Sequence, residues 1–300
     1  MQRPAILDSH QFFLEYLRDQ EGWALIYADQ FPEEAESADI ILAWGGAHGI
    51  ENCMRAADLS HKKKIIYLLQ GIHRFTDIQL NKMFACGNLW LSAYPSQIER
   101  RQKNLAHQIT FFPQFYAPEG AYHLRWNRSP VMKCLLTGHT ANPLYPIRHI
   151  IHKKLEDSYW QHRIRRMRHP RWDGGKSPVL AKWEIPAKCR GEYAQEIRRY
   201  FCSIATGSTM KFAVAKYFEI AAVGTLILGE PIKDIDRAGF APWEHYIPIT
   251  KRDVMDGIKY ALENPGPKLD KIRKNARTLV RNNHSMLKRI RTFKKYLREI

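Results

Sequence analysis

The sequence lacks any long hydrophobic run. No apolar stretch reaches the roughly 20 residues that a membrane-spanning helix requires. The opening residues, Met1–Pro4, lack the charged, apolar and small-residue parts of a signal peptide. Repeats and low-complexity segments are also missing, while 45% of the 300 residues are hydrophobic and 12% are aromatic. This composition predicts a globular chain large enough for one or two domains with substantial cores.

Cysteine is scarce and scattered. The five cysteines are Cys53, Cys86, Cys134, Cys189 and Cys202, and no two of them form a CxxC pair. Such spacing excludes the usual disulfide and zinc frameworks. We expect reduced, mostly buried thiols and a cytoplasmic location.

Several catalytic and nucleotide-binding sequences are missing. The chain has no GxxxxGKS or GxxxxGKT sequence, and no GxGxxG follows the first predicted strand, which argues against P-loop, nicotinamide and flavin proteins. HExxH and GxSxG are also absent. The function must therefore be inferred from a less common arrangement of residues.

Charge, in contrast, is abundant and uneven. The net charge is +17, yet the chain through Arg128 has 13 Lys/Arg and 14 Asp/Glu. From Ser129 onward it has 34 Lys/Arg and 16 Asp/Glu. This asymmetry predicts two domains with different partners, the second of which binds something anionic.

Short apolar runs alternate with amphipathic segments along the whole chain, which predicts parallel sheets covered by helices on both faces. The predicted strands are 5–7, 23–27, 39–44, 64–69, 89–93 and 109–112, then 131–136, 162–167, 203–206, 225–228 and 246–249. We expect an α/β protein with a Rossmann-like, doubly wound N-terminal domain over residues 1–125 and a second such domain over 126–285. Residues 286–300 are predicted as a C-terminal helix that packs back on the first domain.

Three segments follow predicted strands of the second domain and should meet at one edge of its sheet. The first contains Gly138 and His139, the second is Gly207-Ser208-Thr209, and the third contains Glu230 and Lys233. We expect the second segment to lie at the N-terminus of a helix, where free N–H groups and the helix dipole suit a phosphate.

Lys211, Lys216 and Glu219 are predicted on that same helix, which Gly224 ends. The two lysines suit a diphosphate. Glu219 is the one acid among apolar residues, and a carboxylate accepts two hydrogen bonds from vicinal ribose hydroxyls. Together the pieces suit a nucleoside diphosphate. Simpler interpretations remain open: Glu219 pairs with Lys216, the Gly-Ser-Thr segment is an ordinary helix cap, and the basic excess is a solvated face.

The segment Lys216–Leu228 resembles the nucleotide-sugar-binding motif of GT-B glycosyltransferases, in particular their CgeB-like, group 4-related branch with a group 1 type C-terminal domain. The motif is a basic residue, any residue, Phe-Glu, small or apolar residues, Gly and an apolar strand. Tyr145–Arg148 and the region from Tyr193 to Ser208 support the resemblance. It covers residues 131–285 well and 1–128 only in general layout.

The resemblance implies two Rossmann-like domains that face each other across a cleft. It also implies that Glu219 binds the ribose and that the loop Gly207–Thr209 lies against the diphosphate. Group 4 enzymes carry another Glu eight residues before the ribose-binding one. Lys211 stands there in this chain, so the stereochemical outcome stays open.

Further properties follow from the resemblance. The donor is a UDP- or GDP-linked hexose or pentose, the acceptor is a hydroxyl of a glycan or glycoconjugate, and neither cofactor nor metal is expected. Basic side chains stabilise the leaving diphosphate. The candidates are Arg148, Lys182, Lys211 and Lys216.

The N-terminal domain would hold the acceptor and the catalytic base. His48 and His73 each follow a predicted strand, and His10 is a third, weaker candidate. A neutral imidazole accepts the proton of an attacking hydroxyl or hydrogen-bonds the donor sugar. An ordinary polar loop histidine is the alternative for each.

A second class of function is a non-catalytic protein that binds nucleic acid or another anionic surface. The segments Lys268–Arg298 and Arg163–Arg168 could follow phosphates. No recognised nucleic-acid module supports this, so we do not expect nucleic acid as a partner. The same charge suits peripheral docking on an anionic membrane that carries a lipid-linked acceptor.

Overall fold

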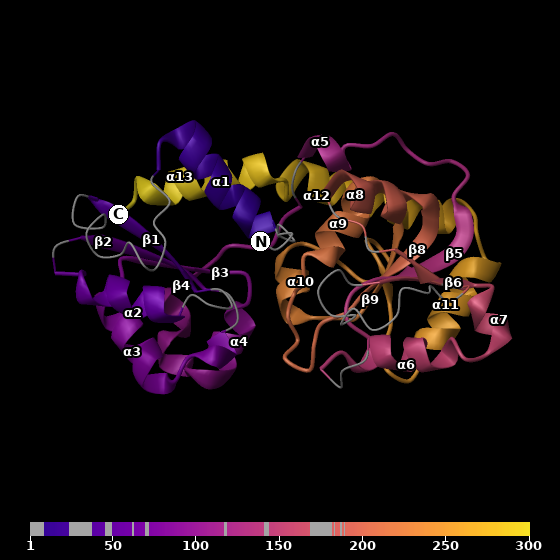
Figure 1. Ribbon diagram of the computed structural model, residues 1–300, viewed down its shortest axis with the longest axis horizontal. Helices are drawn as coiled ribbons and strands as arrows, with labels where there is room; N and C mark the ends of the chain where they lie inside the picture. The colour runs from indigo at the N-terminus through magenta and orange to yellow at the C-terminus, as the bar shows by residue number, and fades with distance from the viewer. Residues whose placement is uncertain are drawn as a thin grey trace. The chain divides into compact units, whose positions relative to one another are not determined.

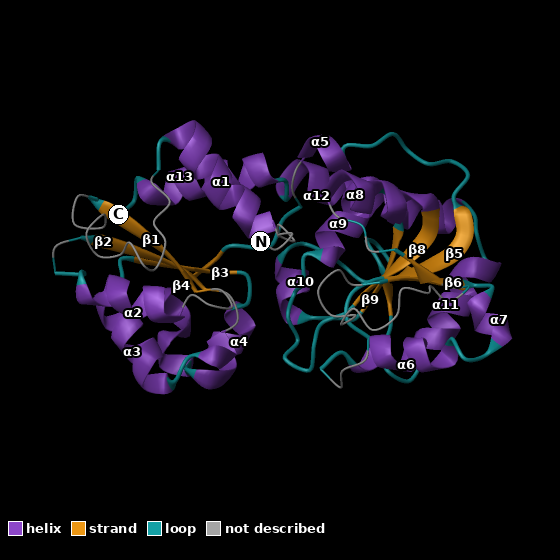
Figure 2. Cartoon of the chain, in the orientation of Figure 1, coloured by secondary structure: helices purple, strands orange, loops and turns teal. Residues whose placement is uncertain are grey.

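A computed structural model of the chain describes residues 9–23, 38–45, 50–61, 63–69, 72–116, 119–140, 144–168, 182, 184–186, 188 and 190–300. The described residues fall into two compact units. We call Phe13–Pro113 with Arg289–Ile300 the N-terminal unit, and the unit that contains Gln114–Lys288 the C-terminal unit. Both are α/β units with a parallel sheet, as Figures 1 and 2 show.

The N-terminal unit contains four parallel strands in sequence order, β1-β2-β3-β4. Its elements are α1 (Ser9–Glu21, which begins before the unit), β1 (Ile40–Gly45), α2 (Ile50–Asp58), β2 (Lys64–Leu69), η2 (Ile72–Arg74), α3 (Asp77–Cys86), β3 (Leu89–Ser92), α4 (Pro95–Arg101), η3 (Lys103–Gln108) and β4 (Ile109–Phe111). All four described strands match predicted ones. The predicted strand at 5–7 and residues 24–27 of the predicted strand at 23–27 lie outside the described residues.

Each face of this sheet has its own apolar layer. Side chains of β1 and β2 pack with those of α2, α3 and α4, such as Cys53, Leu80 and Ile98. A second cluster joins α1, the end of β4 and the last helix, where the ring centroids of Phe13 and Phe293 lie 5.4 Å apart. Burial of these aromatic rings anchors the C-terminal segment within the N-terminal unit.

The C-terminal unit contains six parallel strands in the order β10-β9-β8-β5-β6-β7. Its elements are α5 (Glu119–Tyr122), β5 (Val131–Leu136), α6 (Pro146–Lys154), α7 (Ser158–Gln161), β6 (Ile164–Met167), β7 (Glu184–Ile185), α8 (Arg190–Arg199), β8 (Tyr200–Ala205), α9 (Lys216–Val223), β9 (Leu226–Gly229), α10 (Lys233–Arg237), β10 (Ile247–Pro248), α11 (Val254–Glu263), α12 (Pro267–Asn283) and the start of α13 (Met286–Leu297). The chain runs outward from β5 in one direction and from β8 in the other. The sheet therefore has a topological switch point between β5 and β8, where open α/β sheets bind ligands.

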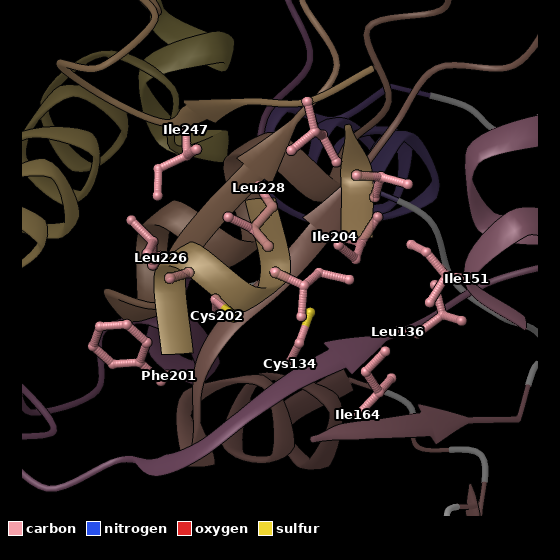
Figure 3. Close-up of a cluster of buried hydrophobic side chains, with 14 of the residues drawn as sticks. Cys134, Leu136, Ile151, Ile164, Phe201, Cys202, Ile204, Leu226, Leu228 and Ile247 are labelled. Carbon is pink, nitrogen blue, oxygen red and sulfur yellow. The ribbon is translucent and has the colours of Figure 1, made fainter. Parts of the chain in front are cut away.

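The central strands β8 and β9 of this sheet are buried along their whole length. Figure 2 shows α8 and α9 on one face and α6 and α11 on the other. Apolar side chains of neighbouring strands, including Leu136, Ile204 and Leu228, form one continuous core with those of α6 and α11 (Figure 3). This burial explains why the strands have near-continuous apolar sequences.

Two helix predictions need correction. The helix predicted directly after Gly207–Thr209 begins only at Lys216. Lys211 adopts a positive φ of 58°, which a right-handed helix cannot contain, and its N–H donates to the Ser208 carbonyl at 2.8 Å. Lys211 and Lys216 are therefore not on one helix. The end of α9 is as predicted, because Gly224 caps it with a φ of 79°.

The helix predicted from Leu269 to the end of the chain is two helices. His284 separates α12 from α13, and its ring is buried against Phe218 and Phe240. The His284 Nε2 atom lies 2.8 Å from the Ala238 carbonyl. This contact and the burial of the ring favour a break over a continuous helix.

Candidate functional site

The candidate site lies where β5, β8 and β9 end. Thr137 directly follows β5, Thr206 directly follows β8, and Glu230 directly follows β9. Because the strands are parallel, their carboxyl ends share one edge of the sheet. The edge includes the switch point, so these three positions lie where a ligand is expected.

A pair of buried cations occupies the centre of this edge. Arg148 on α6 is 3% exposed and donates to both the side chain and the carbonyl of Thr206, at 3.1 and 2.9 Å. Lys216, the first residue of α9, donates from Nζ to the Thr137 hydroxyl. Two threonines that follow adjacent strands thus fix the two cations.

Gly138 permits this approach. A Cβ atom at Gly138 would lie 2.8 Å from Arg148 Nη1 and 2.9 Å from Lys216 Nζ. Gly138 also has a φ of 86°, a conformation that side chains disfavour. The glycine after β5 is therefore required both for the backbone turn and for the space that the two cations occupy.

The positive charges of Arg148 and Lys216 repel each other, which makes it costly to keep both charged in this site. Burial, and then the nearby Arg148 charge, hold the pKa of Lys216 well below its ordinary value, and Glu219 offsets this in part. Burial also lowers the pKa of Arg148. Since buried like charges are unfavourable, an anion bound between them would be strongly favoured.

Glu219 lies one turn along α9 from Lys216. Its Oε1 atom accepts a hydrogen bond from the Tyr122 hydroxyl at 3.3 Å. Tyr193, whose hydroxyl lies 3.3 Å from Thr137 Oγ1, is close enough for the Glu219 charge to raise its pKa, after the larger effect of burial. A carboxylate can accept several hydrogen bonds, so the Tyr122 hydroxyl orients the half-buried Glu219 side chain and need not be its sole donor.

Arginines of α12 hold Tyr122 in place. Arg281 donates to the carbonyls of Ala222 and Tyr122, each at 2.9 Å. Arg273 donates to the Gly224 carbonyl at 2.9 Å. These bonds join the C-terminal end of α9 to the segment that carries Tyr122, and thereby fix the distance between Tyr122 and Glu219.

At the end of β9, Lys211 forms an ion pair with Glu230. The Glu230 N–H donates to the Ala205 carbonyl at 3.0 Å, and the Glu230 carbonyl accepts from the Tyr217 hydroxyl at 2.5 Å. The backbone of Glu230 is therefore fixed by β8 and α9. The Lys211 side chain, which pairs with this carboxylate, is 46% exposed.

The Gly-Ser-Thr loop differs from its prediction. Because α9 starts at Lys216, the dipole of that helix does not act on Gly207–Thr209. The Thr209 N–H donates to the Leu144 carbonyl at 2.8 Å, and the Met210 N–H donates to the Ser208 hydroxyl at 3.1 Å. The expectation of free N–H groups at this loop is therefore wrong at Thr209.

The remaining predicted residues are dispersed. His139 follows Gly138 and is half-buried. Lys182 precedes β7, so it lies toward the opposite edge of the sheet, where its carbonyl accepts from Arg165. The structure brings Gly138, Arg148, Lys216 and Glu219 together and does not bring Lys182 to them.

Of the three candidate histidines of the N-terminal domain, only His73 has a described side chain. His73 lies in η2, which follows β2 in the N-terminal unit, and is exposed. Partial desolvation, then the charges of Arg74 and Arg101, lower its pKa, so the ring is neutral at neutral pH. His48 lies outside the described residues, as does the side chain of His10.

Carboxylates also occur in α10. Asp234 and Asp236 form an Asp-x-Asp sequence, yet Asp234 is fully buried and pairs with Arg237 at 3.3 Å. Across the described part of the chain, no group of three or more His, Cys, Asp or Glu side chains is arranged to hold a metal ion.

Sequence reasoning missed the residues that position the site. Thr137 and Thr206 carry a readable signal, since Thr137 directly follows the predicted strand 131–136 and Thr206 is the last residue of the predicted strand 203–206. Tyr122 and Tyr193 carry none, because the helices that bring them to Glu219 are distant in sequence. In the sequence, a tyrosine of the candidate site cannot be distinguished from a tyrosine that only fills a core.

Comparison with known proteins identifies the class of the chain. Residues 178–295 match the family described as glycosyl transferase-like. This segment contains Thr206, Lys211, Lys216, Glu219 and Glu230. Comparison with curated protein sequences finds none that matches.

Solved structures extend the match to the whole chain. Sucrose-phosphate synthase from Thermosynechococcus elongatus aligns with a TM-score of 0.65 at 11% identity, over 90% of this chain and 76% of the synthase. HepE from Anabaena, in complex with UDP and glucose, aligns with a TM-score of 0.67 at 13% identity, over 89% of this chain and 80% of HepE. A glycosyltransferase from Rickettsia africae aligns with a TM-score of 0.61 at 13% identity, over 100% and 82%. These neighbours have the GT-B fold.

The chain has the GT-B fold, and its residues 178–295 match the glycosyl transferase-like family. The predicted fold class and the predicted enzyme class are both confirmed. Within the described residues, no helix is long and apolar enough to cross a membrane.

Proposed function

We propose that this glycosyltransferase moves a sugar from a nucleoside-diphosphate sugar to a hydroxyl of a glycan or glycoconjugate. The observation that carries the proposal is the buried pair Arg148 and Lys216 at the switch point, with Glu219 beside it. A diphosphate between the two cations would neutralise their repulsion. The ribose would then extend toward Glu219, whose carboxylate accepts bonds from both of its hydroxyls.

In this mechanism the acceptor oxygen forms a bond to the anomeric carbon of the sugar. The bond from that carbon to the diphosphate oxygen breaks, and the diphosphate leaves with the electron pair. Arg148 and Lys216 stabilise the negative charge that develops on the leaving group. We propose that His73 accepts the proton of the acceptor hydroxyl, because its lowered pKa keeps the ring neutral and able to act as a base.

We favour uridine over guanosine as the donor base, because HepE, a protein of the same fold, is known in complexes with UDP and UDP-glucose. We further propose that transfer needs no divalent cation, since two side-chain cations already face the diphosphate. Under this proposal, EDTA leaves the rate of transfer unchanged. A rate that falls with EDTA and recovers with Mg²⁺ or Mn²⁺ would contradict it.

We also propose a cytoplasmic enzyme that docks peripherally on anionic membranes. The four described cysteines, Cys53, Cys86, Cys134 and Cys202, are free, which supports a reducing compartment. The exposed positions of α13 include Lys288, Arg291, Lys294 and Lys295, and the exposed Arg298 directly follows the helix. These cations support attraction to anionic lipid, and co-sedimentation with phosphatidylserine vesicles at two salt concentrations tests it.

The decisive test is nucleotide binding by isothermal titration calorimetry. UDP should bind more tightly than 2′-deoxy-UDP by about tenfold, because the 2′-hydroxyl donates to an ionised carboxylate. Glu219→Ala should weaken UDP binding by a similar factor and abolish the preference for UDP over the deoxy form. Glu263→Ala, at the exposed C-terminal end of α11, is the matched control. If neither UDP nor GDP binds the wild-type protein at millimolar concentration, the proposed function is wrong.

A further inference from the structure

The ion pair between Lys211 and Glu230 lies at the end of β9. The proposed function places neither the diphosphate nor the ribose at this strand end. Sheet order fixes the sequence of sites along the edge. The β9 end carries Glu230 with Lys211, the β8 end carries Thr206 with Arg148, and the β5 end carries Thr137 with Lys216. The order along the edge therefore follows the strand order β9-β8-β5.

Electrostatic neighbours give the same order. Glu219 acts on Lys216 and on Tyr193, which contacts Thr137 at the β5 end. Glu230, in contrast, acts on Arg148 and on Tyr217. The two carboxylates thus flank the cation pair on opposite sides.

A nucleotide sugar has a matching linear order, with the ribose and the transferred sugar attached to opposite ends of the diphosphate. With the diphosphate at Arg148 and Lys216 and the ribose at Glu219, as in the proposed function on which this step rests, the sugar extends toward Glu230. We propose that the Glu230 carboxylate binds hydroxyl groups of the transferred sugar, that Lys211 orients this carboxylate, and that the donor sugar is neutral.

The fixed position of Glu230 supports a binding role. Its backbone N–H and carbonyl are both bonded, to Ala205 and Tyr217, and its side chain is only 10% exposed. A carboxylate held in this way has oxygens that can accept bonds from sugar hydroxyls without losing freedom on binding.

Lys211 has the character of a positioning residue. Its φ of 58° is unusual, because Trp243 is the only other non-glycine residue with a positive φ in the described part of the chain. The turn that holds it depends on Gly207, where a Cβ atom would lie 3.2 Å from the Lys211 Cα atom. In this backbone conformation the Lys211 ammonium group contacts Glu230, which lies 19 residues later in the sequence.

Neutrality of the sugar follows from the charges. An acidic sugar would bring a carboxylate next to Glu230, and Lys211 is already paired with Glu230. Like charges in a partly buried site repel. Hydroxyls, in contrast, donate to Glu230 without adding charge.

The test compares the affinities of UDP, GDP and their sugar conjugates by calorimetry. The panel contains UDP-glucose, UDP-galactose, UDP-N-acetylglucosamine, GDP-mannose and UDP-glucuronate. For the best neutral donor, Glu230→Gln should reduce affinity by about tenfold to a hundredfold. The affinity for the nucleoside diphosphate alone should change by less than about twofold, because it does not contact Glu230. Glu244→Gln, an exposed carboxylate before β10, is the control and should change neither affinity.

Lys211 variants keep the test valid if Glu230→Gln does not fold, because the Lys211 side chain is partly exposed and its replacement empties no core. Lys211→Met should lose affinity for the neutral donor but not for the nucleoside diphosphate. Lys211→Arg should restore most of the loss, which a purely structural role would not require.

Three results would overturn the inference: equal affinity of wild type and Glu230→Gln for the best neutral donor, no neutral donor that binds more tightly than its diphosphate, or a preference for UDP-glucuronate. Failure of wild type to bind any nucleoside diphosphate is a different result. It would refute the proposed function, and the inference with it.

Discussion

The two units of this protein use the same parallel α/β architecture but differ in the way their strands are ordered. The described strands of the N-terminal unit follow sequence order, whereas the C-terminal sheet changes direction between β5 and β8. At that switch point the connections from β5 and β8 leave on opposite sides, which opens space for a ligand. The buried charges Arg148 and Lys216 lie at this point.

The candidate residues in the two units differ accordingly. Arg148 is fully enclosed and makes two hydrogen bonds to Thr206, so its position is determined by the fold. His73 is exposed and lies in a short 3-10 helix. The comparison teaches that nucleotide binding should depend on the C-terminal unit, and that the N-terminal unit should affect catalysis without affecting nucleotide affinity.

The largest expected effect tests this separation directly. His73→Ala should lower kcat by about 100-fold or more, the usual contribution of a general base, while UDP affinity stays within about twofold. Because nearby cations and burial lower the pKa of His73, the wild-type rate should stay level at neutral pH and fall only in acid, as the base becomes protonated. Initial rates from about pH 5 to pH 8, together with calorimetry, measure both effects.

His107→Ala is the matched control for His73, since His107 is another exposed histidine of the same unit. An unchanged kcat in His73→Ala would remove His73 from the mechanism. Loss of UDP binding in that variant would break the separation between the units.

The next effect sharpens the role of the cation pair. Lys216→Met should weaken UDP binding by about tenfold near pH 7, because a charged partner of the diphosphate is lost. In the wild type, affinity should fall as pH rises through the depressed pKa of Lys216, and binding should be accompanied by proton uptake. Titrations in buffers of different ionisation enthalpy measure that uptake, which Lys216→Met should abolish.

The same lysine should reduce the stability of the ligand-free protein. Its pKa is lower in the folded than in the unfolded state, so the unfolded state binds more protons between the two values and stability rises with pH in that window. Lys216→Met should therefore raise Tm at neutral pH in the absence of nucleotide. A lower Tm would show that the lysine stabilises the fold, contrary to its role as a strained binding residue.

The smallest effect concerns the orientation of Glu219. Tyr122→Phe removes one hydrogen bond to this carboxylate and should weaken UDP binding by about threefold. The affinity for 2′-deoxy-UDP should fall less, because this nucleotide donates fewer hydrogen bonds to the Glu219 carboxylate that Tyr122 orients. Tyr116→Phe removes a hydroxyl that contacts His123 instead and serves as the control. Equal losses for both nucleotides would indicate a general disturbance of the site.

The sequence predicted much of the fold because its signals are local. Apolar runs of four to six residues predicted β2 and β5 with the observed bounds, and Gly224 marked the end of α9. Glu219 was conspicuous because an acid in an apolar helix needs a partner. These features follow from periodicity and from the cost of burying charge, both of which can be read from neighbouring residues.

Local reasoning failed where a distant contact decides the conformation. The turn at Lys211 delays α9 to Lys216, and Lys211 pairs with Glu230. The break at His284 is accompanied by a contact to Ala238. In neither case does the helix propensity of the segment reveal the competing interaction.

The sequence by itself determined that the chain has two α/β halves, that the second is strongly basic, and that Glu219 and its flanking residues resemble a nucleotide-sugar motif. Only the tertiary structure decided which cations meet. Strand order brought Arg148 and Lys216 together at the switch point and left Lys182 toward the other edge. The physical reason is that strands far apart in sequence become neighbours in a parallel sheet, so their ends, and not the spacing of residues along the chain, define the site.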